Sequence, residues 1–241
     1  MLVKADLHIH SSLDPVDIIN LKPEFLIDKA KEFGFKVMAF THHEQYFCSK
    51  EIEEYAKKKG LLIIPGGERS IEGRDVLIYN VPQEKFDKVK NFKDLESLKK
   101  KHPESLIIAP HPCVPFRSLN GKLEKYHYLF DAVEWMHFYT RFLNYNKKAA
   151  RIAKKHKLPL IASSDTHFKC QFGRNYSEIE TDSLSRKAVI KAIKQGNIKL
   201  QTKPLSIFEF IKVVLRIFWM DLQILKRNLN AQNPPPHKCK K

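Results

Sequence analysis

The chain has 241 residues, 43% of them apolar, which is enough to bury a substantial core as one large α/β domain. Lys and Arg (43) outnumber Asp and Glu (27), and the formal net charge of +16 would attract phosphates, nucleic acid or anionic lipid without choosing among them. The four cysteines lie far apart and the first residues lack a signal-peptide pattern, so we expect a cytoplasmic protein without a disulfide framework or zinc ribbon.

Short apolar runs alternate with charged stretches of helical period, which predicts parallel strands joined by helices. The expected strands are 2–7, 36–40, 61–65, 75–79, 106–109, 132–136 and 158–162. The expected helices are 23–33, 50–59, 92–101 and 144–156, several of them bounded by Gly, Pro or Asn. Seven strands in this rhythm fit a barrel or an open doubly wound sheet, and periodicity alone leaves the two choices even.

Residues 205–229 form a long apolar segment with a narrow polar stripe at helical spacing, which predicts an amphipathic helix. It carries too many charges for a bilayer span, so we expect its apolar face to pack against the barrel, with peripheral contact to a membrane or a partner helix as the alternatives. The domain plan is then a barrel over 1–203, this helix over 204–230 and a disordered basic tail over 231–241.

Histidines and carboxylates recur directly after the apolar strands. The candidates are His8, His10, His42, His43, Glu68, His111, Glu134, His137, Asp165 and His167. In a β/α barrel the C-terminal ends of the strands meet at one rim, so residues far apart in the sequence become neighbours. Their recurrence at six strand ends therefore favours a barrel over an open sheet, and it predicts one multinuclear metal site.

Imidazole nitrogens mixed with carboxylates, without thiolates, suit zinc, manganese or iron. Glu68 follows two glycines, which we expect to turn the backbone tightly and to place a carboxylate that can bridge two cations. Two cations can hold a hydroxide and neutralise charge on phosphate oxygens. We therefore expect hydrolysis of a phosphoester by a metal-bound hydroxide, with no Ser or Cys nucleophile.

Five motifs in this order, DLHIHSS, FTHHE, PGGE, APHP and SSDTH, resemble the PHP family, named for polymerase and histidinol phosphatase. The resemblance extends over roughly residues 1 to 200. It implies a distorted (β/α)7 barrel that holds up to three metal ions at its C-terminal rim. It also implies hydrolysis of phosphomonoesters, nucleotides or nucleic-acid ends at that rim.

The resemblance further implies roles for eight residues. His8, His10, Glu68 and Asp165 would surround one divalent ion, Glu68 and His111 would bind a second, and Asp14, His43 and His167 would hold a third. The catalytic group would be His8, His10, Glu68 and Asp165, acting through the bound water. Asp17 lies close enough in sequence to replace Asp14.

Two departures from the family pattern affect the expected number of ions. His42 stands where the family usually has an aspartate, which should alter the groups around the ligands and leave His43 as the ligand. The strand after Glu68 reads GRDVLIYN and lacks the histidine that relatives often carry, so Asp75 or water would have to complete that ion. Of two or three divalent ions, two is therefore the safer expectation.

Arg69, Arg117 and Arg174 follow Glu68, His111 and His167 in loops. Arginine can grip phosphate with two parallel hydrogen bonds, so we expect these three to bind the substrate phosphate, with solvated surface arginines as the alternative. The leading function is hydrolysis of a small phosphomonoester or nucleotide. The alternatives are an exonuclease acting on nucleic-acid ends and a non-catalytic metal-binding interaction module, and the sequence does not indicate an oligomeric state.

Overall fold

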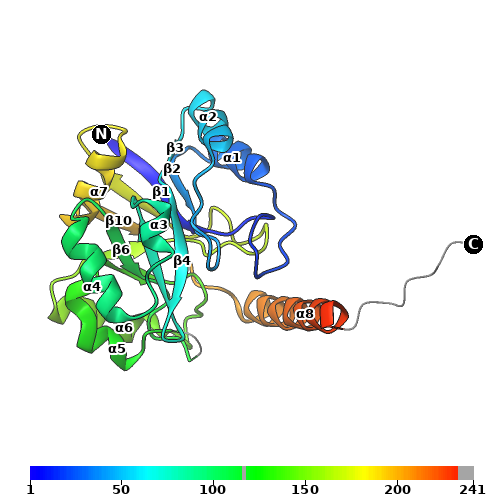
Figure 1. Ribbon diagram of the computed structural model, residues 1–241. Coiled ribbons are helices and arrows are strands. Elements are labelled where there is room, and N and C mark those ends of the chain that lie inside the picture. Colours follow the sequence, from blue (N-terminus) through cyan, green and yellow to red (C-terminus); the bar gives the residue numbers. More distant parts are fainter. Residues whose placement is uncertain (116–117, 233–241) are drawn as a thin grey trace, which may run out of the picture.

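The strands form two five-stranded sheets in the computed structural model, which describes residues 1–115 and 118–232 (Figure 1). In the first sheet, β1 (Leu2–Ile9), β2 (Phe35–Phe40) and β3 (Leu62–Ile63) are parallel, and β9 (Tyr176–Glu180) runs antiparallel to both β1 and β10 (Ile198–Gln201). In the second sheet, β5 (Arg74–Tyr79) runs antiparallel to β4 (Gly66–Ile71) and β6 (Leu106–Ala109). The parallel strands β7 (Ala132–Trp135) and β8 (Leu160–Ala162) follow β6.

The two sheets lie edge to edge at two places without closing into one barrel among the described residues. β2 contacts β4 at one seam, and β8 contacts β9 and β10 at the other. Isolated bridges cross these seams, between Ile9 and Thr166 and between His43 and Glu68. β3 has two residues and β8 has three, so neither is long enough to continue the pairing into the other sheet. The α/β class is confirmed, whereas the closed (β/α)7 barrel is not.

The four expected helices are present as α1 (Pro23–Glu32), α2 (Lys50–Lys58), α4 (Phe92–Lys101) and α6 (Asn146–Lys155). Local chemistry explains where two of them begin: the side chains of Ser49 and Asn91 accept hydrogen bonds from the backbone N–H groups of Ile52 and Asp94. The structure adds α3 (Gln83–Phe86), α5 (Gly121–Tyr126), the 3-10 turn η1 (His127–Leu129) and α7 (Arg186–Lys194).

The buried side chains form three layers. The middle layer lies between the sheets, because it combines residues of β1, such as Leu7, with residues of β5 and β6, such as Leu77 and Ile108. A second layer lies under α1 and α2, and a third under α4, α5 and α6. Helices thus cover the outer face of each sheet, which leaves the carboxyl ends of the parallel strands open to carry a site.

The C-terminal helix α8 (Ile207–Gln232) meets the rest of the molecule through a narrow face (Figure 1). Val213 and Met220 are buried there, and the polar residues Glu209 and Arg227 contact the body. Seven large apolar residues at helical spacing point to solvent instead, with exposed fractions of 40 to 61%: Ile207, Ile211, Val214, Leu215, Phe218, Leu222 and Leu225. The expectation that the wide apolar face packs against the body was therefore wrong.

Two further predictions concern this end of the chain. Within the described residues, no helix combines the length and the apolar character that crossing a bilayer requires. The predicted helix 204–230 corresponds to α8, although α8 starts three residues later and includes the first two residues assigned to the tail. The rest of the predicted disordered tail, residues 233–241, lies outside the described part of the chain.

Candidate metal centre

Five strands, or the loops directly after them, bring the predicted side chains to one place. His8 lies in β1 with His10 directly after it, His43 follows β2, Glu68 lies in β4, His111 follows β6, and Asp165 and His167 follow β8. The Nε2 atoms of His8 and His10 are 3.2 Å apart. The spacing of two along β1 explains this pair, because alternate residues of a strand share one face.

Glu68 lies at the middle of the cluster and is 2% exposed. Its Oε2 lies 3.5, 3.4 and 3.3 Å from the Nε2 atoms of His8, His10 and His43. Its Oε1 lies 3.2 Å from Nε2 of His111. The two carboxylate oxygens therefore face different histidines, which is the arrangement that a carboxylate needs to bridge two cations.

The glycines before Glu68 act differently from the expectation. Gly66 and Gly67 lie within β4 and do not have positive φ angles, so they make no tight turn. A Cβ on Gly67 would lie 2.4 Å from the backbone oxygen of Gln45, and one on Gly66 would lie 2.4 Å from the ring of Tyr79. Both positions need glycine because the backbone is closely packed there, and this packing holds Glu68 against the histidines.

Three overlapping groups of side chains could each hold a metal ion. The groups are His8, His10 and Asp165; His8, Glu68 and His111; and His10, His43 and His167. Within each group the ligand atoms lie within 4.8 Å of one another. Histidine nitrogens with carboxylate oxygens are a donor set typical of zinc, manganese and iron, so the residues fit divalent ions.

Asp14 contacts the histidines from outside these groups. Its Oδ2 lies 2.8 Å from Nδ1 of His10 and 3.1 Å from Nδ1 of His43, and it also accepts the His43 backbone N–H. Asp17 lies close by, with Oδ2 2.9 Å from Nε2 of His167 and 3.8 Å from Nδ1 of His43. The structure thus brings both acids to the site, and Asp14 faces the nitrogens that point away from Glu68.

Glu134, in β7, is a candidate residue without a predicted role among the metal ligands. Its side chain is fully buried, and Oε1 lies 3.0 Å from Nδ1 of His8. Its Oε2 accepts the backbone N–H of His111 at 2.8 Å. One carboxylate therefore fixes the ring of His8 and the backbone of His111. Its recurrence with the ligands along the apolar strands already made it a candidate, whereas its two partners are set by the fold.

The other candidate residues of the rim lie beside the cluster. Nε2 of His42 is 2.8 Å from Oγ of Ser11, and burial lowers the pKa of His42 to about 4. Nε2 of His137 is 2.9 Å from Nε2 of Gln171, and Oε1 of Gln171 accepts the backbone N–H of His167. Among the described residues, neither His42 nor His137 belongs to a candidate metal group, and the same holds for Asp75.

The backbone is strained where two ligands leave their strands. His111 and Asp165 have φ angles of 29° and 46°, in the left-handed region that residues other than glycine rarely adopt. Strain of this kind persists only where surrounding contacts enforce it, and it gathers at functional sites. At His111 the enforcing contact is the hydrogen bond from its N–H to Glu134.

The buried charges of the cluster shift one another. Burial disfavours the protonated form of His43, but Glu68 and Asp14 outweigh burial and raise its pKa to about 10. Glu68 also outweighs burial at His111 and raises the pKa of that ring to about 9. In the opposite direction, burial together with neighbouring histidines lowers the pKa of His10. Without metal, protons on some of the histidines thus neutralise the carboxylates.

Two of the three arginines predicted to bind phosphate have partners within the protein. Nη1 of Arg69 lies 2.7 Å from Oε2 of Glu44, and Nε donates to the Val89 backbone oxygen. Arg174 forms two contacts with Glu209 of α8, at 2.7 and 3.1 Å. Arg117 lies outside the described residues. A phosphate-binding role for these arginines stays a prediction.

The comparisons with known proteins agree with this arrangement. Residues 144–198 match a family described as PHP-associated, PHP_C. No curated protein sequence matches the chain. A two-domain protein from Bacteroides vulgatus, described as containing a predicted PHP-like metal-dependent phosphoesterase, has a TM-score of 0.65 at 18% identity over 83% of this chain and 64% of its own.

Two other solved structures are similar. PsfC from Pseudomonas syringae has a TM-score of 0.61 at 15% identity, covering 92% of this chain and 99% of PsfC. The lesion-specific endonuclease PfuEndoQ from Pyrococcus furiosus has a TM-score of 0.59 at 17% identity, covering 83% of this chain and 58% of its own. The chain thus spans less than two thirds of the Bacteroides and Pyrococcus proteins.

Fold and site together define an α/β protein with a histidine and carboxylate cluster at its strand ends. The resemblance to the PHP family that the five motifs predicted is confirmed, because residues 144–198 match the PHP-associated family and the fold is similar to that of a PHP-like protein.

Proposed function

We propose that this protein is a metal-dependent phosphoesterase that hydrolyses a small phosphomonoester or nucleotide. The observation that supports this proposal is the overlap of three candidate ion groups around Glu68 at one rim. His8 is shared by two groups and His10 by two, so bound ions would lie close enough to act on one phosphate. The similarity in fold to PHP-like metal-dependent phosphoesterases agrees with it.

Each group would hold one divalent ion, and two ions are the minimum that the proposal requires. Divalent ions held there supply Lewis acidity, which lowers the pKa of water and neutralises charge on phosphate oxygens. In the described part of the chain, the three candidate groups consist of histidines and carboxylates, so these residues would supply binding and orientation rather than a nucleophile.

The carboxylates outside the groups would set the histidine tautomers. Glu134 lies against Nδ1 of His8, and Asp14 lies against Nδ1 of His10 and His43. A proton held on each Nδ1 leaves the lone pair on Nε2, the atom that faces Glu68 in all three rings. Glu134 and Asp14 are therefore positioning residues, and the nitrogens are oriented for metal before any ion arrives.

The proposal is tested with purified protein loaded with Mn²⁺ or Zn²⁺ and an aryl phosphate. The wild-type protein should release phosphate, and His10→Ala or Asp165→Ala should abolish the release. His102→Ala is the matched control, because His102 lies at a helix end beside Glu104, away from the cluster, and should retain activity. Full activity in both site variants would overturn the proposal.

A second candidate is hydrolysis of nucleic-acid ends. The net charge of +16 and the similarity in fold to a lesion-specific endonuclease favour it. Faster cleavage of labelled oligonucleotides than of mononucleotides by the metal-loaded protein would support this candidate. Stoichiometric metal without hydrolysis of either substrate would support the third, a non-catalytic metal-binding module.

A further inference from the structure

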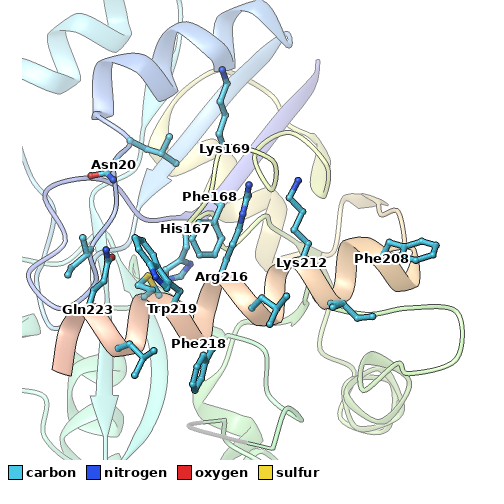
Figure 2. Close-up of a pocket in the computed structure, with 16 residues that line it drawn as sticks. Asn20, His167, Phe168, Lys169, Phe208, Lys212, Arg216, Phe218, Trp219 and Gln223 are labelled. Carbon is cyan, nitrogen blue, oxygen red and sulfur yellow. The ribbon is translucent and has the colours of Figure 1, made fainter. Parts of the chain in front are cut away.

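A groove runs along α8 and borders the metal cluster at His167. It lies between α8, from Phe208 to Gln223, and two loops around residues 18–21 and 167–169, and we call it the α8 groove (Figure 2). Its volume is about 800 Å³. His167, which belongs to one of the three candidate ion groups, is one of its lining residues. The groove therefore borders the cluster at His167.

The lining of the α8 groove is apolar with a cationic side. Ten of its sixteen residues are apolar, and none is acidic. Three are cations: Lys169, Lys212 and Arg216. The guanidinium of Arg216 lies 5.6 Å from the centre of the Phe168 ring, next in sequence to His167, so this charge lies near the residue at which the groove borders the cluster (Figure 2).

The α8 groove is long compared with a phosphate group. Its lining on α8 extends over fifteen residue steps, which corresponds to about 22 Å of helix. Leu215 and Phe218 in its wall are both 61% exposed, as large apolar side chains seldom are unless they meet a partner. An extended hydrocarbon chain would cover such a wall, whereas a compact polar metabolite would leave it in water.

We propose that the α8 groove binds an anionic phosphoester that carries an extended hydrocarbon chain, with its phosphate toward His167; this inference rests on the phosphoesterase function proposed above. The apolar chain would lie along α8, where burial of its methylenes stabilises the complex. Lys212 and Arg216 would attract the anionic end, since no acid lines the groove to oppose it. The acids near His167, Asp17 and Asp165, are already paired with it.

Binding is measured without catalysis, by calorimetry on metal-free protein in chelator, with inorganic phosphate, butyl phosphate and octyl phosphate as monomeric probes. Affinity should rise by about twofold for each added methylene, because full burial is worth about fourfold and the groove is open on one side. The emission of Trp219, which lines the groove, should shift to the blue with octyl phosphate, and Trp219→Phe should remove that shift.

Two pairs of variants locate the site. Leu215→Glu should weaken octyl phosphate binding at least about tenfold, because it places a charge in the apolar wall and repels the phosphate. Leu225→Glu is its control, since Leu225 is similarly exposed on α8, at 55% against 61% for Leu215, but does not line the groove. Lys212→Gln should weaken binding of octyl phosphate but not of octanol, and Lys226→Gln, outside the groove, should change neither.

Vesicles of phosphatidylcholine with and without phosphatidic acid identify the source of the ligand. Octyl phosphate that competes with phosphatidic acid vesicles would support the proposal with a lipid phosphate as ligand. Octyl phosphate binding without vesicle binding would support it with a soluble ester. Vesicle binding without octyl phosphate binding, or equal losses in Leu215→Glu and Leu225→Glu, would overturn it.

The two proposals fail separately. Hydrolysis of a small aryl phosphate without any dependence of binding on chain length would overturn the proposal for the α8 groove and support the phosphoesterase function. The opposite outcome is binding to metal-free protein that depends on chain length, with no hydrolysis of aryl or alkyl phosphates by the metal-loaded protein. It would overturn the phosphoesterase function and support the α8 groove as a binding site.

Discussion

Replacing Glu134 by glutamine should weaken metal binding without removing a metal ligand. The Glu134 carboxylate is fully buried and accepts two hydrogen bonds, from Nδ1 of His8 at 3.0 Å and from the backbone N–H of His111 at 2.8 Å. Glutamine keeps the size of the side chain, but only its oxygen can accept a hydrogen bond. Its NH2 group would face a donor, either Nδ1–H of His8 or the backbone N–H of His111. One of the two contacts is therefore lost, together with the negative charge.

The expected magnitude follows from these contacts. A hydrogen bond to a charged, buried group contributes about 1.5 to 3 kcal/mol, and carboxylates that orient metal-binding histidines typically account for about 10- to 100-fold in metal affinity. Glu134→Gln should thus lower the affinity of the ion group that contains His8 and His111 by that factor. Because the ligands remain, activity should return at excess metal.

Calorimetric titration with Mn²⁺ or Zn²⁺, paired with aryl phosphate hydrolysis at rising metal concentration, measures both effects. Glu104→Gln is the matched control, because Glu104 also lies beside a histidine, His102 at 3.1 Å, but is away from the cluster. Unchanged metal affinity in Glu134→Gln would refute the positioning role. Activity that excess metal does not restore would refute it too, since Glu134 would then act on the substrate or an ion directly.

Three other predictions concern protons and α8. His43 and His111, with pKa values of about 10 and about 9, are protonated at pH 7 without metal, so metal binding should release protons. The binding enthalpy measured by calorimetry should then vary with the ionisation enthalpy of the buffer, and an enthalpy that is the same in all buffers would contradict the prediction. These raised pKa values stabilise the metal-free fold fully below the ordinary histidine pKa of about 6.5, and this stability is lost as pH rises through about 9 to 10. The Tm in chelator should therefore fall between pH 6.5 and 10, and a flat profile would contradict the pairing. Arg174→Gln removes the contacts with Glu209, so it should speed proteolysis at the start of α8 with little change in the Tm of the body. Unchanged proteolysis would show that the buried residues Val213 and Met220 suffice to hold the helix.

Strands with continuous apolar sequence were predictable, and strands held by tertiary contacts were not. β2 and β6 are almost entirely buried and consist of apolar residues apart from Lys36, so their places followed from the sequence. β4, with the sequence GERSI after Gly66, and β9, with YSEIE, carry polar residues that periodicity assigns to loops. The hairpin of β4 and β5 turns at Glu72 and Gly73, both with positive φ, and Glu72 gave no sign of that conformation.

The convergence of the ligands was also predictable, because the carboxyl ends of parallel strands share one rim whether or not the sheet closes into a barrel. The partners of individual side chains were not, since they depend on distances that only the fold sets. Arg174 pairs with Glu209, thirty-five positions later, and Glu134 holds His8 from 126 positions away. The direction of α8 was missed for the same reason: its amphipathic pattern defines two faces but not which of them meets the body.

Metal content measured together with activity tests the central claim most directly. Protein loaded with Mn²⁺ or Zn²⁺ and freed of excess metal should carry two or three ions per chain by elemental mass spectrometry, and should hydrolyse an aryl phosphate in proportion to that content. His10→Ala should lose both metal and activity, because His10 belongs to two of the three ion groups. A chain that binds no metal, or one that keeps hydrolysing after complete removal of metal by chelator, would contradict the account.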